Sequence, residues 1–281
     1  MQKRTNKRDR QKTWPTLILI LIFLLGLSLL LYPTLSDYWN SFHQSRAIAS
    51  YAEAVAEMDN ELYQAMLADA AAYNAKLTQR GTKWHLSDGE LAEYEDLLRV
   101  SDRGVMGHIE IPAINVSLPI YHGTSDSVLQ EGVGHLEGSS LPVGGESTHC
   151  VISGHRGLPS ARLFTDLDEL REGDTFMLCV LNETLTYEVD QILIVEPTDL
   201  SALNIVAGED YCTLVTCTPY GVNTHRLLVR GHRIETENVS TIRVTGDAVQ
   251  LESTLIAPLV AAPILLVLLV LLLFKTRRRK N

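Results

Sequence analysis

The chain has 281 residues, of which 46% are hydrophobic, and its 34 acidic residues outnumber its 24 basic residues to give a formal net charge of −10. This length is enough for one complete hydrophobic core. The excess of acid argues against a nucleic acid partner, because phosphate binding needs a basic surface. The histidines and cysteines show none of the spacings typical of metal ligands, so no metal or other cofactor is expected.

Two apolar stretches lie near the ends of the chain. Residues 14–33 are rich in Leu and Ile, and residues 254–274 form another run of about 20 residues, the length that crosses a bilayer. The flanking tails, residues 1–13 and 275–281, carry eleven basic residues against one acid. The positive-inside rule therefore predicts a cell-membrane protein with two spans, both termini in the cytoplasm and an acidic segment outside.

Each apolar stretch has an alternative interpretation. The first could belong to a cleaved signal peptide, but the small residues Ala47 and Ala49 that would suit cleavage lie too far beyond it. The second, followed by basic residues, could be a cell-wall sorting tail. Such tails follow an LPxTG-like pentapeptide, and the preceding VQLESTLIAP has none. Two uncleaved anchors are therefore predicted.

Residues 34–103 are predicted to form an extracellular helical extension. Apolar side chains over 51–77 recur every three or four residues, which indicates one face of a long amphipathic helix, and Gly81 ends it. A second, shorter helix is expected over 88–98. The linker between the two helices, RGTKWHLSD, contains Trp84.

From Gly104 the pattern changes to alternating apolar and polar residues, which is typical of β-strands. A short helix is expected over 164–170. Several short strands separated by turns favour a closed barrel or a sandwich over residues 104–248. Beyond the first alternating stretch, strands are predicted at 149–153, 175–181, 185–196, 211–217 and 226–234.

Two of these strands form a predicted hairpin, TLVTCTPYGVNTHRLLVRG. Its first strand ends at Cys217 and its second begins near Arg226, so a thiol and a guanidinium are expected at the same end of neighbouring strands, whose axes lie about 5 Å apart. Neighbouring His225 is expected to point to the opposite face and to be a structural residue or part of the rim. Upstream, the segment CVISGHRG places His155 just after another short strand.

Four cysteines in an exported segment raise the question of disulfides. Cys212 and Cys217 lie on one predicted strand, about 16 Å apart, which is too far to bridge. Cys150 and Cys179 could pair only if the fold brings them together. Buried free thiols are therefore predicted for Cys150, Cys179 and Cys212.

These segments resemble the sortase family. Its signature is TLxTC followed about nine residues later by an arginine, here Cys217 and Arg226, with a histidine well upstream, here His155. The sequences SGHRG and CTPYGVNTHRLLVRG are similar to those of class C, the pilin-polymerising branch, and the resemblance covers roughly 105–234. It implies an all-β closed barrel of about eight strands with short helices, an N-terminal helical extension and a transmembrane helix at each end.

The resemblance also implies a function. A membrane-anchored cysteine transpeptidase would cleave an LPxTG-like sorting signal between Thr and Gly through a thioester. It would then transfer the product to a lysine amine of another pilin subunit and so assemble covalent pili. Cys217 would be the nucleophile, His155 the general acid and base, and Arg226 the group that stabilises the oxyanion. Thr216 and Leu214 are expected near the substrate groove. The implied partners are pilins or surface proteins that bear the sorting signal.

In class C sortases the linker before the barrel commonly carries an Asp-Pro-aromatic lid over the cysteine. This chain lacks that tripeptide, so Trp84 is the candidate lid, with simple packing between helices and barrel as the alternative. Three other functions compete. They are a housekeeping sortase that anchors surface proteins to peptidoglycan, a non-catalytic membrane-tethered component of pilus assembly, and a hydrolytic cysteine protease.

Overall fold

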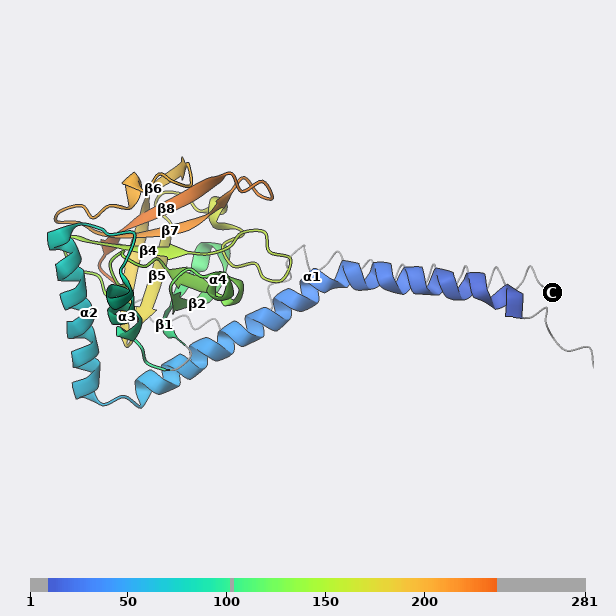
Figure 1. Cartoon of the computed structure of the whole chain (residues 1–281), viewed down its shortest axis with the longest axis horizontal. Coiled ribbons are helices and arrows are strands. Elements are labelled where there is room, and N and C mark those ends of the chain that lie inside the picture. The colour runs from blue at the N-terminus through green and yellow to red at the C-terminus, as the bar shows by residue number, and fades with distance from the viewer. Residues whose placement is uncertain (1–9, 102–103, 237–281) are drawn as a thin grey trace, which may run out of the picture. The chain divides into compact units, whose positions relative to one another are not determined.

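The computed structural model describes residues 10–101 and 104–236. Eight strands close into a barrel in the order β1-β2-β3-β4-β7-β8-β6-β5 (Figure 1). The closed barrel expected from the sequence is therefore confirmed. The strands are β1 (Val105–Ile111), β2 (Val116–His122), β3 (Val133–His135), β4 (Thr148–Ser153), β5 (Thr175–Val180), β6 (Glu183–Val195), β7 (Asp210–Thr218) and β8 (His225–Ile234).

Alternating burial explains why these segments form a barrel. Along β5, Phe176, Leu178 and Val180 are buried, whereas the residues between them are partly exposed. Successive side chains of a strand point to opposite faces, so one face of each strand fills the interior. Most neighbouring strands are antiparallel, but β2 pairs with β3 and β4 pairs with β7 in parallel. Closure leaves no unpaired strand edge in the ring.

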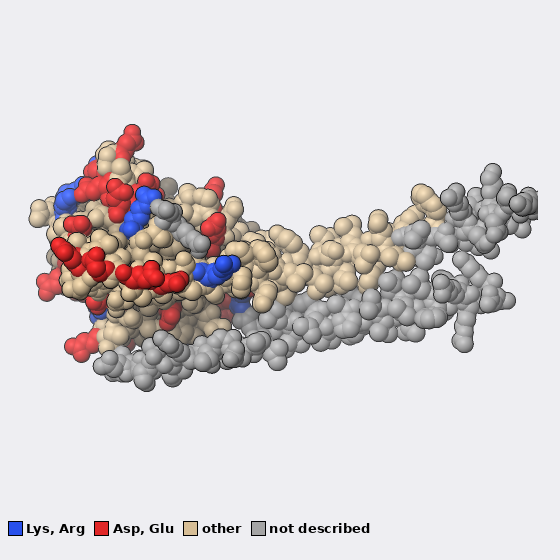
Figure 2. All heavy atoms as spheres, turned by 90° about the horizontal axis from the view of Figure 1, so that it is seen from below, with Lys and Arg blue, Asp and Glu red and all other residues tan. Residues whose placement is uncertain are grey.

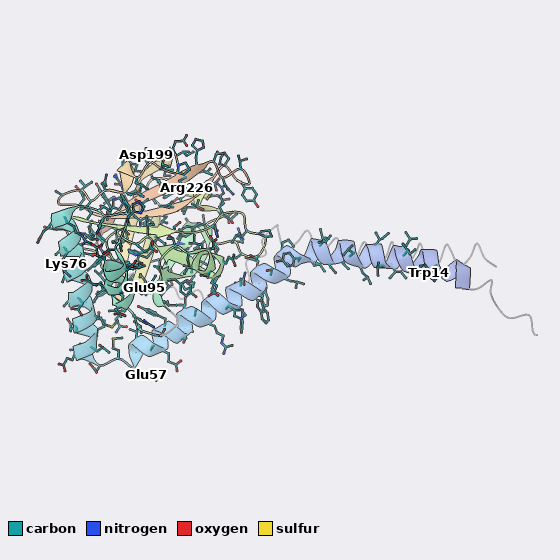
Figure 3. All side chains as sticks on the ribbon, in the orientation of Figure 1. Trp14, Glu57, Lys76, Glu95, Asp199 and Arg226 are labelled. Carbon is teal, nitrogen blue, oxygen red and sulfur yellow. The ribbon has the colours of Figure 1, made fainter. Side chains whose placement is uncertain are left out.

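The helical extension departs from the sequence prediction at one point. One helix was expected over 51–77, but the chain forms α1 (Arg10–Ala56) and α2 (Asn60–Arg80). Asp59 caps α2, because its carboxylate accepts a hydrogen bond from the amide of Leu62 at 2.7 Å. Figure 3 shows Glu57 at the resulting bend.

The remaining helices follow the predictions more closely. Helix α2 ends at Gly81, whose φ of 79° favours glycine, as expected. Helix α3 (Asp88–Asp96) lies within the predicted range. A further short helix, α4 (Asp126–Glu131), precedes β3. The predicted helix over 164–170 is reduced to one 3₁₀ turn, η2 (Leu167–Glu169). Two other 3₁₀ turns are η1 (Pro112–Ile114) and η3 (Ser201–Leu203).

The extension is joined to the barrel by buried hydrogen bonds. Tyr51 of α1 donates to the carbonyl of Met106 at 2.9 Å and accepts from the amide of Leu181 at 2.7 Å. Asn74 of α2 exchanges two hydrogen bonds with the backbone of Leu141. Buried side chains of both helices belong to the same core cluster as the strands. Helices α1, α2 and the barrel therefore share one hydrophobic core over residues 38–236.

The first part of α1, up to Asp37, forms a separate unit. The helix from Ile18 contains an 18-residue window of mean hydropathy 2.5, none of it buried. Within the described residues it is the one helix long and apolar enough to cross a membrane, although a signal sequence meets the same criterion. The predicted second span, 254–274, and the tail at 275–281 lie outside the described residues.

The surface of the barrel unit carries more acid than base. Figure 2 shows Asp and Glu side chains spread across the visible face, with fewer Lys and Arg among them. This distribution follows from the composition, since eleven of the 24 basic residues but only one acidic residue lie in the two tails. The segment between the tails is therefore strongly acidic.

Candidate active site

The β7–β8 hairpin brings a thiol and a guanidinium together. Cys217 on β7 and Arg226 on β8 are direct cross-strand partners, followed by Thr218 and His225. Partners in a sheet have side chains on the same face, so both groups lie on one side of the sheet. The turn that joins the strands is closed by hydrogen bonds from the amides of Val222 and Asn223 to the carbonyl of Pro219. The pairing expected from the sequence is present.

Arg226 keeps most of its donors available. Its Nη1 atom donates to the carbonyls of His225 at 3.1 Å and Asn223 at 3.4 Å, which anchors one edge of the guanidinium to the turn. Within residues 10–101 and 104–236, no carboxylate forms an ion pair with this side chain. A guanidinium has five N–H donors in a planar fork. The unused donors can therefore bind a negatively charged oxygen in the pocket.

His155 lies two residues after β4, at the end of the barrel that also holds Cys217. The parallel pairing of β4 with β7 continues past Ser153, because the amide of Gly154 donates to the carbonyl of Val215 at 3.0 Å. Thr216 completes the link with a hydrogen bond from its hydroxyl to the carbonyl of Gly154 at 2.8 Å. The position of His155 is thus tied to the residue that precedes Cys217.

Close packing makes glycine necessary before the histidine. A Cβ atom on Gly154 would lie 2.7 Å from the fully buried ring of Phe164 and 3.0 Å from Val133. The His155 imidazole itself has no hydrogen-bond partner in the part of the chain that the structure describes. Its ring can therefore donate to or accept from a bound substrate.

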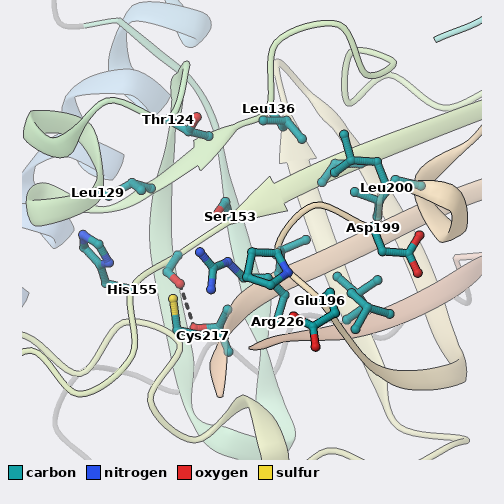
Figure 4. Close-up of a pocket in the computed structure, with 18 residues that line it drawn as sticks. Thr124, Leu129, Leu136, Ser153, His155, Glu196, Asp199, Leu200, Cys217 and Arg226 are labelled. Carbon is teal, nitrogen blue, oxygen red and sulfur yellow. Dashed lines mark hydrogen bonds between the residues drawn. The ribbon is translucent and has the colours of Figure 1, made fainter. Parts of the chain in front are cut away.

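All three side chains line one pocket with a cavity volume of about 270 Å³. Figure 4 shows Cys217 between His155 on one side and Arg226 on the other. Asp199, which Figure 3 labels together with Arg226, lines the same pocket. The wall beside the three groups is largely apolar, which suits an extended peptide with apolar side chains. Its lining includes Leu129, Leu136, Val151, Val195, Pro197, Leu200, Leu203, Val215 and Leu228.

The two residues expected near the substrate differ in position. Thr216 lines the pocket, but it is only 2% exposed and its hydroxyl is bound to Gly154. Leu214 is fully buried in the barrel core and is not among the residues that line this pocket. Thr216 therefore supports the histidine segment, while Leu214 packs inside the barrel.

Most of the apolar wall was not recognised from the sequence. Leu136, Val151 and the stretch from Val195 to Leu200 are three separate segments that meet only in the folded barrel. No local motif marks them, because each reads as an ordinary strand or loop residue. Two acidic residues at the pocket, Glu196 and Asp199, were missed for the same reason.

Trp84 packs against this wall from the linker between α2 and α3. It belongs to a cluster with Val151, Leu203 and Leu228, three residues that also line the pocket. Trp84 is not itself among the lining residues. The linker is held close to the barrel, since a Cβ atom on Gly138 would meet the carbonyl of Lys83.

The remaining candidates do not line the pocket. His225 does not line it, and its Nε2 atom lies 3.3 Å from a carboxylate oxygen of Glu196. All four cysteines are free thiols. Cys150 and Cys212 are buried as expected, but Cys179 is partly exposed, because it faces outward on β5. Within the described residues, no group of three or more His, Cys, Asp or Glu side chains could hold a metal ion.

Comparison with known proteins places this geometry in a family. The model of the Sortase domain matches residues 109–234. Sortase C1 from Streptococcus agalactiae is 56% identical, with a TM-score of 0.67, and the match covers 68% of this chain and 100% of that structure. Streptococcus pneumoniae sortase C is 48% identical, with a TM-score of 0.61, over 67% of this chain and 96% of that one.

A curated relative gives the same result over a shorter region. Sortase D of Bacillus subtilis is 34% identical over 131 residues, which are 46% of this chain and 63% of the relative. The chain thus spans less than two thirds of that protein's length. The solved structures, by contrast, are covered almost completely and share the fold of this chain. The chain therefore belongs to the sortase family of cysteine transpeptidases and is similar to its class C, pilin-polymerising members.

Proposed function

We propose that this protein cleaves an LPxTG-like sorting signal between Thr and Gly and joins the new carboxyl end to a lysine amine of another pilin subunit. The observation that carries the proposal is the cross-strand pair Cys217 and Arg226, with His155 lining the same pocket. This set supplies a nucleophile, a permanent cation and a proton donor around one cavity. The apolar wall beside it suits the Leu and Pro of the signal.

The first step is attack by the Cys217 thiolate on the carbonyl carbon of the substrate threonine. Negative charge then develops on the carbonyl oxygen, and a donor already in place lowers the barrier. Arg226 is suited to this role because it remains charged and its Nη1 anchor to the turn holds the guanidinium beside the cysteine. Collapse of the tetrahedral intermediate breaks the Thr–Gly bond and leaves a thioester on Cys217.

The leaving amine must gain a proton as that bond breaks. His155 as imidazolium is the donor in the pocket, and as neutral imidazole it can later accept a proton from the attacking lysine amine. The resting enzyme must therefore hold a thiolate and an imidazolium together.

Pilin subunits are proposed as the donor and acceptor substrates. The structure of Streptococcus pneumoniae sortase C, which is 48% identical to this chain, is described as giving insight into pilin substrate specificity. The helical extension, which is part of the shared core here, supports the pilin-type enzyme over a housekeeping sortase. The apolar N-terminal helix suggests membrane anchoring. A second span at 254–274 and cytoplasmic termini complete the proposal.

The test is a transpeptidation assay with the full chain in detergent. A fluorogenic LPxTG-type peptide is incubated with hydroxylamine, and the product is identified by mass spectrometry. We expect a hydroxamate on the threonine carboxyl and a transient acyl adduct on the cysteine. The matched control is Cys217→Ala, which should form neither.

Replacing hydroxylamine by lysine-containing pilin peptides then tests the acceptor. Formation of an isopeptide product at a rate above hydrolysis supports pilus assembly. Transfer to a peptidoglycan cross-bridge amine in preference to the pilin lysine would instead indicate a housekeeping enzyme. Cleavage with water alone, even at high amine concentration, would contradict the transpeptidase proposal and leave a cysteine protease.

A further inference from the structure

A second group of reactive side chains lies on the outer face of the barrel, on β1 and β5. His108 and Glu110 are the partly exposed residues of β1, and Cys179 is one of those of β5. His108 and Cys179 are direct cross-strand partners. In the order of the closed barrel, β1 lies opposite β7, which carries Cys217. This group is therefore separate from the pocket.

His108 lies next to both the carboxylate and the thiol. Its Nε2 atom lies 3.6 Å from a carboxylate oxygen of Glu110. Its Nδ1 atom is buried and has no hydrogen-bond partner among the described residues. A neutral imidazole donates with one ring nitrogen and accepts with the other. With Nε2–H facing Glu110, Nδ1 is free to take the proton that Cys179 releases.

The charges around His108 favour its protonated form. Burial lowers its pKa, but interactions with Cys179 and with Glu110 outweigh that effect and raise the pKa to about 9. His108 in turn lowers the pKa of Glu110. His108 is therefore a favourable proton acceptor beside the Cys179 sulfur.

The other groups near the Cys179 thiol carry no charge at pH 7 that would counteract the effect of His108. Tyr51 of α1 is near Cys179, and burial is the main cause that raises the pKa of this phenol to about 12, so it is neutral at pH 7. The hydroxyl of Thr184 on β6 lies 3.9 Å from the Cys179 sulfur. On the β2 side, the cross-strand partner of His108 is the uncharged Pro119. The imidazolium is therefore the cation next to the sulfur.

Exposure distinguishes this thiol from the two structural ones. Cys150 and Cys212 are at most 3% exposed, whereas Cys179 is partly exposed and free. Outside the pocket, Cys179 is thus the cysteine that a small molecule in solution can reach. Its environment also contains the histidine and carboxylate described above.

We propose that Cys179, with His108 and Glu110, forms a thiol-modification site that accepts a small-molecule disulfide. The Cys179 thiolate attacks one sulfur of the disulfide, a new S–S bond forms, and the old S–S bond breaks. The departing thiolate takes a proton from solvent, while the proton from Cys179 stays on His108. Cys179 is oxidised to a mixed disulfide, and half of the small disulfide is reduced to a thiol.

The test uses the full chain in detergent with Cys217→Ser, which removes the pocket thiol. The probe is bis(2-hydroxyethyl) disulfide, an uncharged reagent that the acidic surface neither attracts nor repels. Intact-protein mass spectrometry at pH 7 follows the adduct, and peptide mapping locates it. The matched control thiol is made by Cys179→Ser with Thr175→Cys, which places a cysteine on the same face of β5, away from His108.

We expect one adduct per chain, on Cys179, forming about three to ten times faster than on the control thiol. His108→Gln should reduce the rate to the control level, and Glu110→Gln should reduce it by a smaller factor. Circular dichroism melting identifies any variant that is misfolded. If His108→Gln is misfolded, Glu110→Gln serves as the second test. Equal rates for Cys179 and the control thiol, or no effect of either substitution in folded protein, would overturn the proposal.

Discussion

The pocket is built from two regions that hold their key side chains in different ways. In the β7–β8 hairpin, Cys217 and Arg226 are placed by strand register, so neighbouring backbone hydrogen bonds define their separation. In the segment after β4, His155 lies beyond the last paired residue and depends on packing around Gly154. One region is set by local pairing, and the other by contacts between distant parts of the chain.

This difference predicts how each region responds to substitution. A side chain fixed by register keeps its place when neighbouring residues change, so loss of activity should require loss of the functional group itself. A side chain fixed by packing can move without being substituted, because a shift of about 1 Å at a catalytic group is costly. The following experiments test this contrast, beginning with the largest expected effect.

Arg226→Lys should cause the largest loss. Lysine keeps the positive charge but lacks the planar fork, so the donors beside the developing oxyanion are lost. We expect kcat for cleavage of the sorting peptide to fall by about a hundredfold or more, as for removal of an oxyanion donor. The melting temperature should change little. His225→Gln is the control on the same strand, and comparable loss there would contradict the assigned role.

Gly154→Ala should reduce activity without altering any reacting group. The added Cβ atom would lie 2.7 Å from the buried ring of Phe164, so the backbone that precedes His155 must shift. We expect kcat to fall by about tenfold, with a smaller change in KM. Gly89→Ala is the matched control, because that position in α3 has open space around it. Unchanged kcat for Gly154→Ala would show that packing does not position the histidine.

Trp84→Ala tests whether the linker between α2 and α3 restricts access to Cys217 in the hairpin. Trp84 packs against apolar residues that also line the pocket, so its removal should open access to the cysteine. We expect alkylation of Cys217 to become several times faster, measured by mass spectrometry under pseudo-first-order conditions. Trp39→Ala, at an exposed site on α1, should leave the rate unchanged. An unchanged rate for Trp84→Ala would exclude the lid role.

The smallest effect is expected at His149. This residue lies in the paired part of β4, the strand that leads to His155. Its Nδ1 atom donates to the carbonyl of Asn204 at 2.9 Å, and its Nε2 atom accepts from the hydroxyl of Thr213 at 2.7 Å. Burial lowers its pKa below the ordinary value of 6.5. Both observations favour the neutral ring in the folded protein.

Below pH 6.5 the unfolded chain therefore binds more protons at this site than the folded one does. The contribution of His149 to the free energy of unfolding is complete above pH 6.5 and is lost as the pH falls. The loss is about 1.4 kcal/mol for each unit by which its pKa differs between the unfolded and the folded chain. Denaturant unfolding between pH 5 and 7 should show a weaker pH dependence for His149→Gln than for the native chain. The exposed His85→Gln is the control. An identical slope for His149→Gln would contradict this account.

The sequence by itself was sufficient for the hairpin. An apolar β run, a Pro- and Gly-containing turn and a second β run predict both strands, and register then places Cys217 opposite Arg226. The strand pattern left a closed barrel or a sandwich open, and the resemblance to sortases favoured the barrel, whereas Gly81 marked the end of a helix directly. The hairpin and the helix end depend on interactions between residues close in the chain, which a local pattern records.

Only the tertiary structure decided the rest of the pocket. The apolar wall joins residues from separate segments, Leu214 proved to be a core residue, and Thr216 proved to hold Gly154. The break between α1 and α2 was missed because the apolar period continues across Asp59, whose capping role depends on backbone geometry. Parallel pairing of β4 with β7 brings His155 to Cys217 across more than sixty residues. A local pattern cannot encode such contacts, because their free energy arises only when distant segments pack together.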